Sequence, residues 1–132
     1  MERLISIGLL VSRILLSSIF LYSGAKKVFA FQKTMAFMSD SGMHMAGLFL
    51  VLAILFEVGG GLSVLLGYYP RLGALALLLF LIPTTLVFHR DFAAAGQSTQ
   101  FMKNLAIMGG LFAILAAGAG EFSLVKTKRP GS

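Results

Sequence analysis

The stretch LFLVLAILFEVGGGLSVLLG, residues 48–67, is apolar over a length that can cross a bilayer, yet it carries one acid near its middle. A helix needs about 20 such residues to span the hydrocarbon core. The acid, Glu57, costs roughly 2.5–3.5 kcal/mol at the centre of a membrane helix, so it should face a protein interior and have a partner. We therefore expect a membrane helix that buries Glu57.

Apolar runs of this kind take up most of the chain, at residues 4–22, 46–66, 72–88 and 105–119. Of the 132 residues 12% are charged, whereas soluble domains have about 25%. The runs are apolar on all sides, which argues against the alternating strands of a barrel. We predict an all-α fold, an integral membrane four-helix bundle. It forms a single domain over residues 1–125, followed by a basic disordered tail at 126–132.

The first run is expected to be a retained span rather than a signal peptide, because it contains Arg13 and has no convincing small-x-small cleavage site. The chain has no cysteine, which excludes thiolate catalysis and iron–sulfur ligation by its own residues. We expect no metal site and no covalently bound cofactor. The net charge is +6, and basic residues at span ends usually meet anionic headgroups. Membrane lipids, not nucleic acid, are thus the expected partners.

Arg13 lies about halfway along the first run, at the depth expected of Glu57 in the antiparallel second span. We therefore predict that the two side chains pair. Snorkelling of Arg13 to the headgroups is the alternative, but its depth makes that a long reach. Lys27 shares the helical face of Arg13 and lies nearer the membrane boundary. The glycines at 59–61 either let a neighbouring helix pack closely or leave space for a headgroup, and both interpretations stay open.

The connections between the runs also carry signals. Residues 28–45 have apolar residues near helical spacing, which predicts an interfacial helix, with a turn at 39–42 and no role for His44. Residues 67–71 predict a short turn in which Pro70 begins the next helix. Pro83 should kink the third span. Thr84 and Thr85 follow it and are available to donate hydrogen bonds to the carbonyls that the proline leaves unpaired. Residues 93–100 are expected to form a small polar loop.

Polar residues gather at one membrane face. A lone histidine there would be an ordinary interfacial residue, but His89 has Lys27, Lys103 and Asn104 at similar depth. We predict a polar mouth with Glu57 as its floor, and we assign no catalytic residue. The predicted ligand-binding residues are Arg13, Lys27, Glu57, His89, Lys103 and Asn104.

The order and spacing of these residues resemble the DoxX family over nearly the whole chain. The matching features are Arg13, YSGAKKV at 22–28, EVGG at 57–60, LGYYPR at 66–71, His89, Lys103-Asn104 and GAGEFSL at 118–124. One departure is Val125, where the family usually has an acid. The resemblance implies a small multi-pass protein of the bacterial inner membrane with these positions gathered in one site. With the basic tail, it places the termini in the cytoplasm.

Some members of this family are tied to quinone-linked redox chemistry, as subunits of a thiosulfate:quinone oxidoreductase or of a membrane oxidoreductase complex. The first hypothesis is therefore a quinone-interacting subunit, at most accessory to an enzyme. Lys27, His89, Lys103 or Asn104 would bond the carbonyls, and a soluble or membrane redox partner would supply electrons. Glu57 could exchange a proton.

The alternative is a non-enzymatic membrane module that binds or carries a small anion or a lipid, or an assembly factor. With no inverted repeat, a transporter of four spans would need to form a homo-oligomer. A third interpretation is purely structural, in which the buried pair only specifies helix register.

Overall fold

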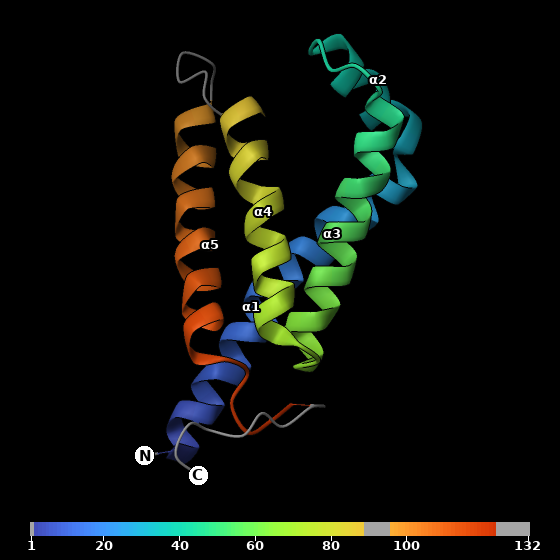
Figure 1. Ribbon diagram of the computed structural model, residues 1–132. Helices are drawn as coiled ribbons and strands as arrows, with labels where there is room; N and C mark the ends of the chain where they lie inside the picture. Colours follow the sequence, from blue (N-terminus) through green and yellow to red (C-terminus); the bar gives the residue numbers. More distant parts are fainter. Residues whose placement is uncertain (1, 89–95, 124–132) are drawn as a thin grey trace.

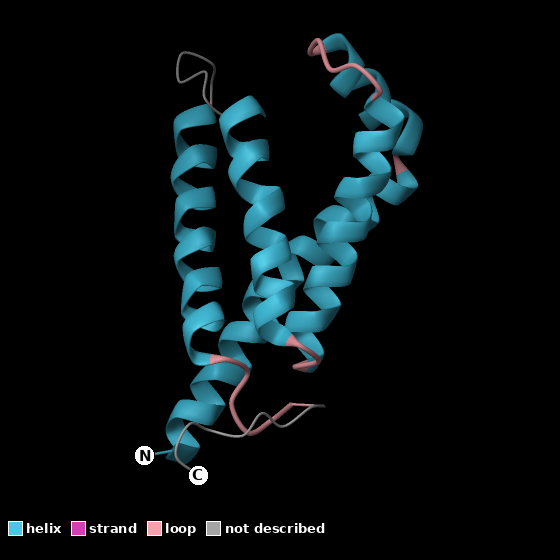
Figure 2. Ribbon diagram, viewed as in Figure 1, coloured by secondary structure: helices cyan, strands magenta, loops and turns pink. Residues whose placement is uncertain are grey.

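The computed structural model describes residues 2–88 and 96–123, and within these ranges the chain is helical, without a strand (Figures 1 and 2). The helices are α1 (Glu2–Phe29), α2 (Phe31–Asp40), α3 (Ala46–Leu66), α4 (Pro70–Phe88) and α5 (Gln97–Ala117). Helices α1, α3 and α5 are long and apolar enough to cross a membrane, and α4 has a shorter apolar segment, Pro70–Leu86. The predicted all-α membrane bundle is confirmed. The predicted tail lies outside the described residues.

The long helices form two arms that meet at one end of the molecule. Helices α4 and α5 lie side by side, while α3 runs along the second half of α1 and carries α2 against its first turns (Figure 1). The arms join through contacts of α3 with α4 and of α1 with α5. They diverge toward the end that carries α2 (Figure 1). The start of α1 and the end of α5 lie at the joined end, where the Glu121 N–H faces Ser6 Oγ at 3.4 Å.

Most helix boundaries agree with the sequence. Helix α3 covers the predicted run 46–66, α2 confirms a helix within 28–45, and α4 begins at Pro70 after a left-handed Gly67 with φ of +70°. Helix α5 begins at Gln97, so the loop predicted at 93–100 is wrong over 97–100, and its first three residues lie outside the described ranges. The helix starts directly after its N-cap Gly96, which is left-handed with φ of +79°.

The region after Pro83 differs from expectation in its hydrogen bonds. Thr84 Oγ1 donates to the Phe80 carbonyl and Thr85 Oγ1 to the Leu81 carbonyl, both at 2.7 Å. Pro83 frees the carbonyl of residue 79, one position earlier, because it lacks the N–H that would bond four residues back. We predicted that the two threonines would bond the carbonyl that Pro83 leaves unpaired. This is wrong, because they donate to the carbonyls of Phe80 and Leu81 instead.

Two of the three adjacent glycines serve helix packing. A Cβ added at Gly60 would lie 2.8 Å from Leu77 Cγ, and one at Gly61 would lie 3.0 Å from a methyl carbon of Leu21. The first distance is shorter than real Cβ contacts and the second is at the tight limit, so α4 and α1 approach α3 closely at these positions. Gly59 has nothing within 4 Å of its added Cβ. It borders an apolar groove of about 300 Å³ between α3 and α4 that does not include Glu57.

The main core cluster is drawn from all four long helices. Its buried members are Phe20, Val64, Ala74, Leu77, Leu78, Leu81, Leu111 and Ile114. A smaller cluster lies between α2 and α3. Polar side chains are buried as well, namely Ser6, Arg13, Ser17, Glu57, Thr85 and Asn104. Buried polar groups are costly unless they are bonded, so their partners identify where the bundle departs from simple apolar packing.

Candidate functional site

The buried acid of α3 is paired with a lysine of α1. Lys27 Nζ donates to Glu57 Oε1 at 2.8 Å and to Ser23 Oγ at 2.7 Å. The Glu57 side chain is 3% exposed and the Lys27 side chain 23% exposed. Ser23 lies one helical turn before Lys27, so the two side chains meet on one face of α1. The site is therefore a buried carboxylate, and its partner cation, Lys27, is the more exposed member of the pair.

The second carboxylate oxygen of Glu57 is not part of the ion pair. Oε2 is buried and has no hydrogen-bond partner among the described residues. A Cβ added at Gly24 would lie 3.7 Å from Oε2 and 2.6 Å from Val58 Cγ2, so the missing side chain of Gly24 lets α1 approach α3 here. An ionised carboxylate accepts about four hydrogen bonds, and leaving a buried acceptor unsatisfied costs roughly 1–3 kcal/mol. Oε2 is thus an acceptor that a hydrogen-bond donor would stabilise.

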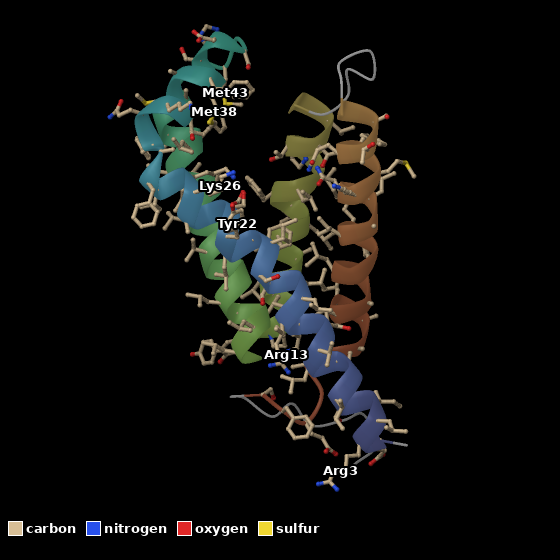
Figure 3. The ribbon with its side chains drawn as sticks, turned by 180° about the vertical axis from the view of Figure 1, so that it is seen from behind. Arg3, Arg13, Tyr22, Lys26, Met38 and Met43 are labelled. Carbon is tan, nitrogen blue, oxygen red and sulfur yellow. The ribbon has the colours of Figure 1, made fainter. Side chains whose placement is uncertain are left out.

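The predicted pair of Arg13 with Glu57 is wrong. Arg13 is 1% exposed and bonds to main-chain carbonyls instead. Nε donates to Val64 O and Nη2 to Leu65 O, both at 2.8 Å. Nη1 donates to Ala119 O at 2.9 Å and also to Phe122 O. Figure 3 shows Arg13 toward the joined end of the arms, away from Tyr22 and Lys26 of the same helix.

Helix register is the reason for this difference. Gly61 of α3 packs against Leu21 of α1, and Glu57 packs against Gly24. Helix α3 therefore covers the second half of α1, while the first turns of α1 extend past the end of α3. At about 1.5 Å per residue, Arg13 lies roughly 16 Å along α1 from the position that faces Glu57.

Main-chain carbonyls, rather than an acidic side chain, stabilise the positive charge of Arg13. Val64 and Leu65 are in the last turn of α3, whose carbonyls have no partner within the helix. These carbonyls form the negative end of the helix dipole, equivalent to about half an elementary charge. The guanidinium thus meets concentrated carbonyl dipoles from α3 and from the segment after α5. It joins the segment after α5 to α3 and does not contact Glu57.

A second buried polar group joins α4 and α5. Asn104 Nδ2 donates to Thr85 Oγ1 at 3.0 Å, and Gln100 Nε2 donates to Asn104 Oδ1 at 3.2 Å. With Thr85 Oγ1 donating to Leu81 O, this set is internally satisfied. It fixes the two helices of one arm, as polar contacts between membrane helices do.

The other predicted site residues are distributed as follows. Lys103 is exposed, and His89 lies outside the described residues. Lys27 Nζ is 6.0 Å from the centre of the Phe80 ring of α4, so the ion pair faces the other arm across an aromatic side chain. The structure thus brings Lys27 and Glu57 together, keeps Asn104 with Thr85, and puts Arg13 elsewhere. Ser23 was missed, although its position one turn before Lys27 would have revealed it.

These features define a small integral membrane protein whose helices enclose a buried ion pair. The chain belongs to the DoxX family, whose family model matches residues 8–90. It is similar to Inner membrane protein YqjF of Escherichia coli (strain K12), with 38% identity over 124 residues and 94% of each chain covered. Inner membrane protein YphA of the same strain is 27% identical over 121 residues, covering 88% of this chain and 86% of that protein. No solved structure gives a significant match. The side of the membrane that holds the termini stays a prediction.

Proposed function

We propose that this DoxX-family inner membrane protein binds the headgroup of a quinone beside the Lys27–Glu57 pair, as the membrane subunit of a redox complex. The observation that carries the proposal is the buried Glu57 Oε2, which has no partner among the described residues. A purely structural role for the ion pair does not explain why Oε2 is left unpaired. A binding site explains it, because a ligand that donates a hydrogen bond to Oε2 removes the cost of the unsatisfied acceptor.

The polar groups of the pair match the two redox forms of a quinone headgroup. Lys27 has three N–H donors, of which two are used by Ser23 and Glu57, so the third can bond a quinone carbonyl. Glu57 Oε2 can accept a hydrogen bond from the hydroxyl of the reduced form. The Phe80 ring near Lys27 supplies an apolar surface for the headgroup ring.

A bound quinone would supply two-electron, two-proton chemistry. In this scheme Lys27 orients the headgroup, and Glu57 holds or releases a proton at Oε2. The chain has no cysteine to carry electrons, so a redox partner would deliver them. The chain's own contribution is binding, orientation and proton exchange.

The alternative ligands are a small anion and an anionic lipid. Both would need positive charge that is not already neutralised. The charge of Lys27 is met by Glu57, and Arg13 is occupied by carbonyls roughly 16 Å along α1. Among the described residues, the cation beside Glu57 is thus already neutralised, which favours a neutral headgroup at this position.

The test is the quinone content of the full chain, purified in polymer nanodiscs with its native lipid. Organic extracts are analysed for quinone and phospholipid and compared with the bulk membrane. We expect quinone enrichment in wild type that falls about tenfold in Lys27→Met and in Glu57→Gln, as the loss of one charged hydrogen bond implies. Lys26→Met is the matched control, because Lys26 is adjacent but exposed.

Two results would overturn the proposal. The first is a quinone-to-phospholipid ratio in wild type no higher than in the bulk membrane. The second is equal enrichment in Lys27→Met and Lys26→Met. Enrichment of one phospholipid species that depends on Lys27 would favour the lipid-binding alternative.

A further inference from the structure

The corner between α2 and α3 concentrates sulfur ligands. Residues 35–45, MAFMSDSGMHM, contain four of the seven methionines of the chain and one of its two histidines. Met35 and Met38 are three residues apart in α2, so they lie on one face of that helix. An apolar face needs only aliphatic side chains, and it does not explain why thioethers recur here.

The end of α2 brings a third methionine onto this face. Met43 N donates to Met38 O at 3.2 Å and Gly42 N to Ser39 O at 3.0 Å, with Gly42 left-handed at φ +89°. These paired bonds are a Schellman motif, in which the residue after the glycine typically contacts the residue five positions before it. Met43 packs against the buried cluster that contains Met38. The backbone geometry at the end of α2 favours this placement of Met43.

The three side chains belong to one apolar cluster between α2 and α3. Met38 is 8% exposed, and Met35 and Met43 are partly buried against the cluster that contains it. Figure 3 shows Met38 and Met43 together at this end of the molecule. Met35 Sδ reaches α3, where it would lie 3.3 Å from a Cβ added at Gly47. His44 follows Met43 in the chain and is exposed.

We infer that Met35, Met38 and Met43 form a binding site for a soft monovalent metal ion, Cu(I) or its analogue Ag(I), with His44 as a further ligand. Thioether sulfur is a soft donor that selects Cu(I) over harder ions. Among the described residues no group of three or more His, Cys, Asp or Glu could hold a metal ion. Thioethers are therefore the ligand set that the described part of the chain offers. This inference is independent of the quinone proposal, because it uses none of the residues near Glu57.

The test is a Cu(I) titration of the full chain in detergent, under reducing conditions, in competition with the coloured chelator bicinchoninate. We expect saturable withdrawal of Cu(I) by wild type and affinity about tenfold or more weaker in Met38→Leu and Met43→Leu, since a lost ligand should cost at least what an outer-shell change does. Leucine nearly conserves the volume of methionine, so folding should lose less than about 1.5 kcal/mol. Met102→Leu is the control, because Met102 is 61% exposed on α5.

X-ray absorption of the copper-loaded protein gives a second readout, and we expect sulfur ligands in wild type. Melting temperatures with Ag(I) should rise in wild type and in Met102→Leu but not when Met35, Met38 and Met43 are all leucine. The inference is overturned if that triple variant withdraws as much Cu(I) as wild type, or if wild type withdraws none. Should the triple variant not fold, equal Cu(I) affinity of Met38→Leu, Met43→Leu and wild type overturns it as well.

Discussion

Replacing Arg13 by methionine should destabilise the bundle more than any other single change to a charged residue. Arg13 donates to four carbonyls, two at the end of α3 and two in the segment after α5. Methionine fills much of the same space but donates nothing. The variant therefore leaves the last turn of α3 without its partner and releases the segment after α5 from α3.

The magnitude follows from the number and kind of these bonds. A hydrogen bond from a charged donor contributes about 1.5–3 kcal/mol net. Part of that gain offsets the desolvation of the guanidinium, which is several kcal/mol for a buried ion. We therefore expect Arg13→Met to lower the free energy of unfolding by about 3–5 kcal/mol, the range seen when a buried charged network is broken. Arg13→Lys keeps the charge without the planar fork and should lose about half as much.

The assay is reversible unfolding by SDS in mixed micelles, followed by circular dichroism. Arg3→Met is the matched control on the same helix, because Arg3 is exposed, and it should change the free energy by less than about 0.5 kcal/mol. The effects of Arg13→Met and Glu57→Gln should add to within about 0.5 kcal/mol, since the two residues are not in contact. Equal losses in Arg13→Met and Arg3→Met, or strong coupling between Arg13 and Glu57, would refute the carbonyl-anchoring role.

Three further pairs of variants test other contacts in the same unfolding assay. Lys27→Met and Glu57→Gln should be coupled by about 0.5–3 kcal/mol because the side chains form a direct pair, and additive losses would contradict that pair. Gly60→Ala should cost about 1–3 kcal/mol, because its Cβ would lie 2.8 Å from Leu77 Cγ, whereas Gly59→Ala meets open space and should be neutral or slightly stabilising. Thr85→Val should cost about 1–3 kcal/mol by leaving Asn104 Nδ2 unpaired, while Thr84→Val, which breaks a bond only within α4, should cost clearly less.

The sequence predicted the helices well because their signals are local. The limits of α3, the helix within 28–45 and the start of α4 at Pro70 all follow from runs of apolar residues and from turn-forming residues. The burial of Glu57 was predictable too, since a carboxylate exposed to lipid is too costly. Helix α5 was misjudged at Gln97–Gln100 because small polar residues are typical of loops, whereas the left-handed Gly96 is already the N-cap of the helix.

The partner of Glu57 was beyond the reach of the sequence. Arg13 and Lys27 occupy the same face of α1, so the helical pattern alone allows either to meet the acid. The choice depends on how far α3 slides along α1, and that is set by close packing at Gly24 and Gly61. Sequence by itself thus determined the main helical segments and the burial of Arg13 and Glu57, because hydrophobicity acts along the chain. Only the tertiary structure decided that Lys27 holds Glu57 while Arg13 holds the carbonyls of α3, because register is a property of two packed helices.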